Sequence, residues 1–335
     1  MKEMRQCMIK LTANPSTVFL RTTETCNLKC IQCDYHKNNS ISRNNALTLE
    51  EKLNLIHDIK KWNKDIRISL TGGEPFVRKD IFYKLAEECK KVGLRASVTT
   101  NGTLIEKEEL KRILDLDLEF ILISIDSNDE KIHNNIRGNK DAFQLTTKFA
   151  KDIIELRNNI NNKTQIYVSS LLGKNNLNNI KGIIEFFEKI GFDGIFFQAI
   201  QPNFSSEYKD NWKEESSLYP TYEEAEKGIR EILKLKSAHK IITQTEEQFI
   251  DMLTYFKNPF ELPFKKCEAM NTLFIINEDG ETQFCFDMAR LGVKSCGNVR
   301  TETLKEIWDK NKELREKMSR CTYGCGIMNC HYKEE

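Results

Sequence analysis

The chain has 335 residues and a formal net charge of +1, with 51 Lys and Arg against 50 Asp and Glu. Hydrophobic residues make up 39% of it, which is enough for a buried core and excludes a wholly disordered chain. The balanced charge gives no basic field on which nucleic-acid binding could rest. No apolar run approaches the roughly 20 residues that a bilayer span needs, and no signal-peptide pattern follows the start, so we expect a cytoplasmic protein without a membrane partner.

The chain alternates short β-rich runs with longer amphipathic runs between residues 17 and 200. Strands are expected at Val18–Thr22, Ile66–Leu70, Arg95–Thr99, Phe120–Ile125, Gln165–Leu171 and Gly194–Ala199. Helices are expected at Leu49–Trp62, Ile81–Val92, Glu106–Leu114, Ala142–Leu156 and Ile180–Ile190. Thr48, Asp80 and Asn179 are candidate helix starts, and Gly93 and Gly191 candidate ends. This alternation predicts an α/β fold with a parallel sheet, and six units favour a partial (β/α)6 TIM-like barrel over a closed barrel of eight.

The remainder of the chain divides by composition. Residues 1–16 are an N-terminal extension, 17–200 the partial barrel, 201–266 a helical, aromatic-rich insertion or linker, and 267–335 a Cys-rich C-terminal domain. The insertion, with helices at Tyr222–Lys236 and Glu246–Phe256, is either a cap with its own small core or a lid that contacts substrate. In the last domain we expect a hairpin of Leu273–Ile276 and Thr282–Phe286, followed by one helix, Glu302–Met318.

The eleven cysteines gather in two groups. Cys26, Cys30 and Cys33 lie on one loop, six more lie between residues 267 and 330, and only Cys7 and Cys89 stand elsewhere. Because structural disulfides are rare in a reducing compartment, this clustering points to metal or redox chemistry. Packing alone would scatter free cysteines along the chain.

The first group directly follows the first predicted strand, with the spacing Cys26-x3-Cys30-x2-Cys33. A structural zinc site normally closes with four ligands, whereas a [4Fe–4S] cluster held by three cysteines leaves one iron open. Sites in parallel α/β sheets gather at the carboxyl ends of the strands, where this loop begins. The pattern therefore favours an iron–sulfur cluster over a zinc knuckle or spare thiols.

Five segments together resemble the radical S-adenosylmethionine (SAM) superfamily. They are the cysteine loop Thr25–Cys33, Thr71–Pro75, Thr100–Thr103, Leu122–Ser127 and His133–Gly138, in the family's order and at or just after the carboxyl ends of successive strands. The resemblance covers residues 17 to 200. It implies an enzyme that reductively cleaves SAM to a 5′-deoxyadenosyl radical, which abstracts a hydrogen atom from the substrate.

The resemblance also implies the roles of individual residues. The cluster ligands would be Cys26, Cys30 and Cys33, and the segment Gly72, Gly73, Glu74 and Pro75 would bind the amino group of SAM. Ser124 and Arg137 would bind its ribose and carboxylate, with Asn101 and Asp126 lining the same cavity. The position before the third cysteine, commonly aromatic in this family, is Gln32, so either Tyr35 or aliphatic side chains would contact the adenine. No catalytic acid or base is assigned.

The Cys-rich tail resembles the auxiliary-cluster domains called SPASM and, in a shorter form, twitch. The resemblance rests on Cys267, the hairpin, Cys285, and a Gly297-Asn298 pair ahead of a helix with Trp308. We favour the twitch-like form with one auxiliary [4Fe–4S] cluster. Five cysteines compete for at most four places on it: Cys267, Cys285, Cys321, Cys325 and Cys330. Cys296 is the expected non-ligand, and a structural zinc, which His331 could join, or two auxiliary clusters are the alternatives.

A tail of this kind implies an oxidative or bond-forming modification. The favoured substrate is a ribosomally synthesised peptide that is crosslinked, oxidised or epimerised, and the alternative is dehydrogenation of a small metabolite such as an amino sugar or cyclitol alcohol. A reductant of flavodoxin or ferredoxin type is the implied partner, joined by a separate leader-peptide-binding protein if the substrate is a peptide. From another class, a non-catalytic iron–sulfur or zinc protein for electron transfer or scaffolding is disfavoured, because it would need no SAM-binding segment at Gly72–Pro75.

Overall fold

The structure is a computed structural model that describes residues 11–33, 35–36, 45–201, 216–258, 267–288 and 292–321. The predicted ligands Cys325 and Cys330 lie outside these residues, as does His331.

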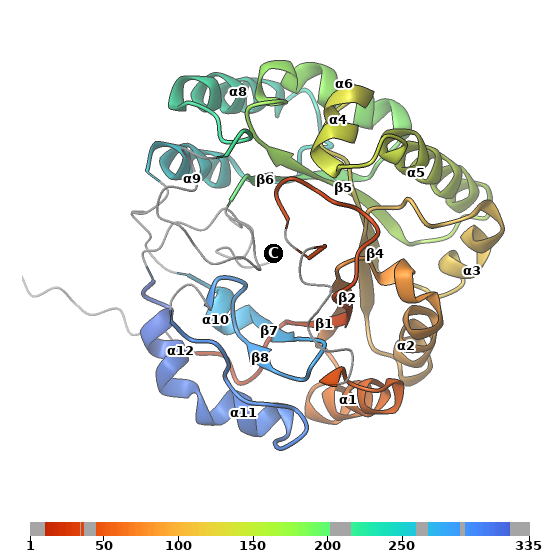
Figure 1. Cartoon of the computed structure of the whole chain (residues 1–335), viewed down its shortest axis with the longest axis vertical. Helices are drawn as coiled ribbons and strands as arrows, with labels where there is room; N and C mark the ends of the chain where they lie inside the picture. The colour runs from red at the N-terminus through yellow and green to blue at the C-terminus, as the bar shows by residue number, and fades with distance from the viewer. Residues whose placement is uncertain are drawn as a thin grey trace, which may run out of the picture.

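One sheet of eight strands organises the described chain, in the order β6-β5-β4-β3-β2-β1-β7-β8. Pairing is parallel from β1 to β6 and between β1 and β7, and antiparallel between β7 and β8. The strands are β1 (Thr17–Thr23), β2 (Arg67–Gly72), β3 (Ala96–Thr100), β4 (Phe120–Ser124), β5 (Gln165–Leu172), β6 (Gly194–Ala199), β7 (Leu273–Ile276) and β8 (Thr282–Gln283). In Figure 1 the sheet curves around a central space and the helices form an outer ring, which confirms the partial barrel.

Helices follow most strands and cover the outer face of the sheet (Figure 1). They are α1 (Leu49–Trp62), α2 (Lys79–Val92), α3 (Leu110–Leu114), α4 (Glu130–Arg137), α5 (Ala142–Asn159), α6 (Ile180–Ile190), α8 (Tyr222–Leu235), α9 (Glu246–Lys257), α10 (Ala269–Thr272), α11 (Leu304–Lys310) and α12 (Lys312–Met318). Short 3₁₀ turns are η2 (Pro75–Arg78), η3 (Lys107–Glu109) and η4 (Leu177–Asn179). Every helix in the described ranges is too short or too polar to traverse a lipid bilayer.

Local sequence signals set several helix ends. Thr48 begins α1 with a capping box, in which its side chain and that of Glu51 each accept the other's backbone N–H. Gly93 ends α2 in the left-handed conformation, with φ of 70°. The start of α2 differs from the expectation, because the 3₁₀ turn η2 leads directly into Lys79 and Asp80 falls inside the first turn.

The predicted single tail helix is wrong in one respect, because it is broken into α11 and α12 at Asn311. The Asn311 side-chain amide donates to the carbonyl oxygens of Cys296 and Ile307, both at 2.8 Å. A side chain that bonds nearby carbonyls competes with the helical ladder and favours a turn there.

The tail hairpin extends the barrel sheet. Strand β7 lies parallel to β1, with Thr17 opposite Leu273 and Leu20 opposite Ile276. Its partner β8 is shorter than predicted and ends at Gln283. Behind the hairpin, the buried Trp308 ring packs against an aromatic group formed by Trp62, Phe274 and Phe284, with centroids 5.3 to 6.1 Å away. The cysteine-rich tail is therefore built onto the strand from which the three-cysteine loop departs.

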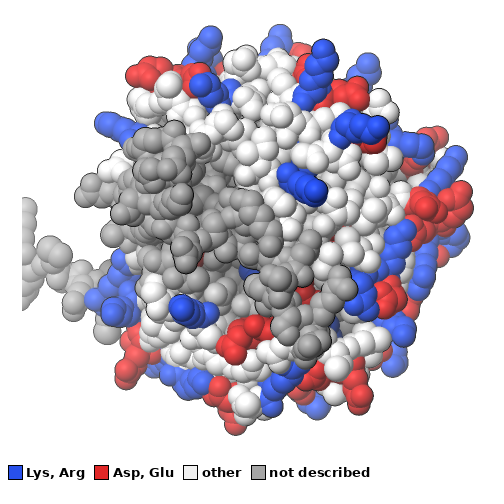
Figure 2. Space-filling view, in the orientation of Figure 1, with Lys and Arg blue, Asp and Glu red and all other residues white. Residues whose placement is uncertain are grey.

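Charge is spread evenly on the face shown in Figure 2. Basic and acidic side chains alternate around the rim, and neither sign forms a continuous patch. This distribution agrees with the net charge of +1.

Candidate active site

The loop that carries the first three cysteines is held against the end of β2 by two glycines. The N–H of Gly73 donates to the Thr23 oxygen at 2.7 Å, and the N–H of Glu74 donates to the Thr25 oxygen at 2.9 Å. A Cβ on Gly72 would lie 2.0 Å from the Thr23 oxygen, and one on Gly73 would lie 2.3 Å from the Thr25 oxygen. Only glycines allow the two backbones to approach this closely.

A second contact joins the loop to the end of β3. The Asn101 amide donates to Asn27 at 3.0 Å, and the Asn27 amide donates to the Thr103 hydroxyl at 2.8 Å. Thr103 closes the ring by donating to the Asn101 side-chain oxygen. Sequence reasoning missed Asn27, although its place immediately after Cys26 was a signal that could have identified it.

A third contact comes from α4. The N–H of Ile31 donates to the Ile136 oxygen at 2.9 Å. Gly138 ends α4 with φ of 62°, and a Cβ there would lie 2.1 Å from the Lys29 oxygen. Contacts within the protein therefore hold the loop from three sides.

The donor set of this loop fits an iron–sulfur cluster with one open iron. Burial raises the pKa of the Cys26 thiol to about 12, and the neighbouring Cys30 and Cys33 add to the effect. Burial also raises the pKa of Cys30. To bind metal these thiols would have to lose their protons, which the positive charge of cluster iron would favour.

No three Cys, His, Asp or Glu side chains within the described ranges are arranged around a single metal ion. The assignment of the cluster ligands therefore rests on the three thiols and stays a prediction for each residue.

Glu74 is fully inside the protein and uses both carboxylate oxygens. Oε1 accepts from the Thr100 hydroxyl at 2.7 Å and the Phe76 N–H at 3.1 Å, and Oε2 accepts from the Asn101 N–H at 2.7 Å. Burial raises the pKa of Glu74 to about 7. The carboxyl group therefore ties the end of β2 to the end of β3. Its contact with the amino group of SAM stays a prediction, as do those of Gly72, Gly73 and Pro75.

Arg137 and Asp126 form a buried ion pair, with Nε and Oδ2 2.8 Å apart. The other oxygen of Asp126 accepts from the Leu171 N–H at 3.1 Å. The charge of the Arg137 guanidinium also acts on Cys30, where it opposes the effect of burial on the pKa of the thiol. Ser124 ends β4 in a half-buried position. The roles of Ser124 and Arg137 toward SAM stay predictions, but Arg137 already has an anionic partner in this chain.

His133, which sequence reasoning quoted without assigning a role, lies behind this pair. Its Nδ1 accepts from the Asp126 N–H at 3.2 Å. Burial, together with the charge of Arg137, lowers the pKa of His133 to about 4, so the ring is neutral at physiological pH. The ring therefore orients the backbone of Asp126.

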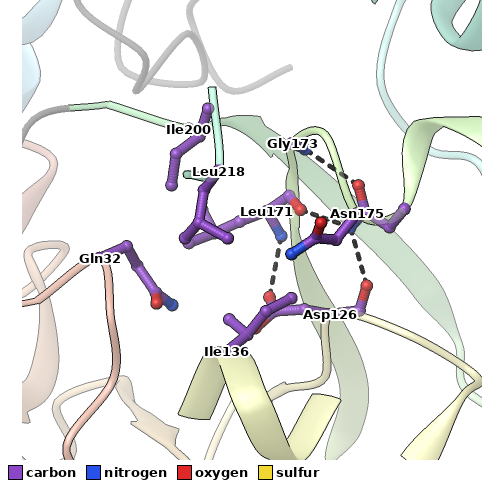
Figure 3. A pocket seen from close by; sticks show the side chains of 9 residues that line it. Gln32, Asp126, Ile136, Leu171, Gly173, Asn175, Ile200 and Leu218 are labelled. Carbon is purple, nitrogen blue, oxygen red and sulfur yellow. Dashed lines mark hydrogen bonds between the residues drawn. The ribbon is translucent and has the colours of Figure 1, made fainter. Parts of the chain in front are cut away.

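A small pocket lies between the cysteine loop and the carboxyl ends of β4, β5 and β6 (Figure 3). It is lined by Gln32, Asp126, Ile136, Leu171, Gly173, Asn175, Asn176, Ile200 and Leu218. Tyr35 is not among the described lining residues, and the Arg21 guanidinium lies over its ring, 5.4 Å from the centroid. The predicted adenine contact of Tyr35 stays a prediction.

Four of the tail cysteines lie in the described part of the chain: Cys267, Cys285, Cys296 and Cys321. The Cys267 N–H donates to the Ser319 oxygen at 3.2 Å, and burial, with a contribution from nearby Cys321, raises the pKa of Cys267 to about 11. The sulfur of Cys285, beyond β8, accepts from the Asp287 N–H at 3.2 Å. Cys296 is buried with its sulfur 3.9 Å from that of Met288, which suits the packing role expected of a non-ligand.

Two family models match the chain. That of the radical SAM superfamily covers residues 20–187, and that of the SPASM iron–sulfur cluster-binding domain covers residues 267–331. The chain belongs to the radical SAM superfamily. It is an enzyme of that superfamily that uses SAM and a [4Fe–4S] cluster and carries a C-terminal auxiliary iron–sulfur domain.

Individual proteins and solved structures are similar to this chain. An AdoMet-dependent heme synthase from Methanosarcina barkeri is 26% identical over 342 aligned residues, covering 98% of this chain and 91% of that protein. The subtilosin biosynthesis protein AlbA of Bacillus subtilis is 33% identical over 130 residues, covering 38% and 28%. Among solved structures, Streptococcus suis SuiB bound to SAM has a TM-score of 0.70 at 16% identity, covering 92% and 69%. The enzyme anSMEcpe with bound AdoMet has a TM-score of 0.69 at 18% identity, covering 91% and 84%.

Proposed function

We propose that this enzyme modifies a ribosomally synthesised peptide by a radical reaction that ends in a crosslink, an oxidation or an epimerisation. The observation that carries the proposal is the pairing of β7 with β1, because it builds the Cys-rich tail onto the strand that leads to the SAM-cluster loop. One scaffold thereby supports both iron–sulfur sites. The peptide substrate is supported by SuiB, whose structure was solved with the precursor peptide SuiA, and by AlbA.

The chain's own residues prepare this chemistry. Cys26, Cys30 and Cys33 would hold the first cluster and leave one iron open. Cys267 and Cys285 would hold the auxiliary cluster together with two of Cys321, Cys325 and Cys330. When bound, the first cluster and SAM supply a radical that removes hydrogen from an unactivated carbon, and the auxiliary cluster supplies a site for an electron. The aliphatic side chains in the pocket wall offer water no hydrogen-bond partner there.

A tetrapyrrole is the second candidate substrate. The M. barkeri heme synthase matches 98% of this chain, whereas AlbA matches 38%. The small-metabolite alternative, an amino sugar or a cyclitol alcohol, stays a prediction.

The first test measures iron after anaerobic reconstitution. The wild type should bind about eight irons, and the Cys26/Cys30/Cys33→Ala variant about four, because one of two [4Fe–4S] clusters is removed. The Cys30→Ala variant should lose SAM cleavage and keep the auxiliary cluster. About four irons falling to none, with zinc in the tail, would rule out the auxiliary cluster and with it the oxidative mechanism.

The second test distinguishes the substrates. Reduced enzyme and SAM are incubated with short peptides encoded beside its gene or with Fe-coproporphyrin III, the product named for a relative of this chain. A peptide that loses two hydrogen atoms, or is epimerised in deuterated water, supports the proposal. Turnover of the tetrapyrrole alone would replace the peptide by the second candidate, and Cys30→Ala is the blank for both reactions.

A further inference from the structure

The pocket beside the cysteine loop has aliphatic walls, with Gln32 on the side of that loop and the other polar side chains, Asp126, Asn175 and Asn176, across from it. One side of the pocket is formed by Leu171 in β5, by Ile200 directly after β6, and by Leu218 in the segment before α8. Ile136 of α4 closes the opposite side (Figure 3). Ile136, Ile200 and Leu218 are each at most 5% exposed. Aliphatic walls of this kind suit the flat faces of a planar ring.

Asn175, Asn176 and Asp126 lie on the far side of the pocket, and the last two have partners within the protein. The side-chain amide of Asn176 donates to the backbone oxygens of Asp126 at 2.8 Å and Leu171 at 2.6 Å. The side-chain oxygen of Asn176 accepts from the Gly173 N–H at 2.9 Å. Asp126 is paired with Arg137. Asn176 therefore shapes the turn after β5, and its carboxamide is occupied by the backbone.

Gln32 is different, because its Oε1 is buried without a hydrogen-bond partner among the described residues. The side chain extends from the cysteine loop toward the pocket, with its amide group leading (Figure 3). A buried acceptor left unpaired is destabilising, and one that lies beside a pocket can be satisfied by a donor on a bound ligand.

The backbone on both sides of Gln32 is fixed. The N–H of Ile31 donates to the Ile136 oxygen at 2.9 Å, and the N–H of Cys33 donates to the Cys30 oxygen at 3.2 Å. Gln32 therefore stands in the sequence between two predicted cluster ligands, and it also lines the pocket.

We propose that the Gln32 carboxamide recognises the edge of the adenine of SAM, in place of an aromatic contact with its face. Oε1 accepts from the 6-amino group, and Nε2 donates to an adjacent ring nitrogen. A glutamine amide carries the acceptor and donor that complement this edge of adenine. The proposal rests on the use of SAM by this family, and it is independent of whether the substrate is a peptide.

The test is equilibrium binding of S-adenosylhomocysteine to the cluster-loaded enzyme by anaerobic calorimetry. The comparison ligand is the same molecule with hydrogen in place of the 6-amino group of adenine, so that it lacks only this hydrogen-bond donor. The wild type should prefer the amino ligand by about 10-fold or more, since a bidentate pair of this kind contributes about 1–3 kcal/mol of discrimination. In Gln32→Leu, similar in size and without polar atoms, the preference should fall to about one-fold, because no buried acceptor remains to be satisfied.

Two further variants separate hydrogen bonding from packing. Gln32→Glu keeps an acceptor and should keep a preference for the amino ligand. Ile200→Val trims the wall and should weaken both ligands alike, leaving their ratio unchanged. Iron content checks that each variant holds its clusters.

A full preference in Gln32→Leu would overturn the proposal, because the amino group would then be recognised elsewhere. If Gln32→Leu does not hold its clusters, the wild type alone tests the proposal. Equal affinity of the wild type for the two ligands would overturn it. Neither ligand requires the substrate, so these results leave the peptide and tetrapyrrole assignments to their own test.

Discussion

The backbone N–H of Glu24 donates to the carboxylate of Glu278 at 2.6 Å. Glu278 lies in the turn between β7 and β8, and Glu24 lies two residues before Cys26. Burial lowers the pKa of Lys52, and the Glu278 carboxylate opposes this effect by favouring the charged ammonium. The Lys52 ammonium donates to the Thr22 backbone oxygen at 2.7 Å. The turn of the C-terminal hairpin therefore supports the start of the SAM-cluster loop.

Replacing Glu278 by Ala should loosen the first cluster. The change removes a hydrogen bond to a charged acceptor and leaves the Lys52 ammonium with less compensation, at a cost of about 2 kcal/mol in folding free energy. Chelator-driven iron loss should show the four irons of the first cluster leaving faster than in the wild type, with the auxiliary cluster unchanged. Glu302→Ala, which removes a surface ion pair with Lys310, is the control. Equal rates in both variants would show that the turn does not support the loop.

Gly138 fixes the loop from the opposite side. In Gly138→Ala the new Cβ would lie 2.1 Å from the Lys29 oxygen, so the loop between Cys26 and Cys30 must move. We expect the iron content after reconstitution to fall from about eight to about four per chain. Gly93→Ala is a matched control, because Gly93 has a similar φ of 70° but its nearest contact is the flexible Lys60 ammonium at 3.6 Å. That variant should lose about 1 kcal/mol of stability and no iron; retention of eight irons by both would contradict the prediction.

The Asp126–Arg137 pair should show strong coupling in a double-mutant cycle. Arg137→Met leaves a fully buried carboxylate without its cation, which costs about 3–5 kcal/mol. Asp126→Asn in the same chain removes the uncompensated charge, so the double variant should be more stable than the sum of the single effects by about 2 kcal/mol. The measurement is the anaerobic denaturation midpoint of all four proteins. Simple additivity would mean that the pair does not act as a unit.

Local signals predicted much of this fold. The range Leu49–Trp62 was predicted without error, because Thr48 and Glu51 form a capping box that acts within four residues. Helix α4 was missed because only Ile132 and Ile136 supply apolar periodicity in its eight residues. The parallel pairing of β7 with β1 was not predictable from the hairpin pattern, since it joins positions more than 250 residues apart.

Part of the candidate site could likewise be predicted from the sequence, and part could not. The spacing of Cys26, Cys30 and Cys33 indicates a cluster loop from sequence alone. The engagement of Glu74 by Thr100 and Asn101 could not be predicted, because it depends on how closely the ends of β2 and β3 approach. The sequence motif marks Glu74 for SAM, while the structure shows its carboxyl group holding two strand ends together.

The raised pKa of Glu74, about 7 against 4.5 in the unfolded chain, makes stability depend on pH. Between these values the folded protein binds more protons than the unfolded protein, so the free energy of unfolding falls as pH rises. The contribution is fully present below pH 4.5 and is lost through pH 7. Glu74→Gln cannot titrate, so the stability of the wild type relative to this variant should fall by about 3 kcal/mol across the window.

Denaturation midpoints of the two proteins, measured anaerobically from pH 5 to pH 8, test this sign, and the clusters common to both cancel in the difference. Glu51→Gln is the control, because the hydrogen bond from Arg300 lowers the pKa of Glu51 to about 2 and places its titration below the window. Its difference from wild type should be constant there. A constant difference for Glu74→Gln as well would mean that Glu74 stays ionised when folded. The bonds from Thr100 and Asn101 would then outweigh its burial, and the carboxylate would carry a full negative charge beside the SAM-cluster loop.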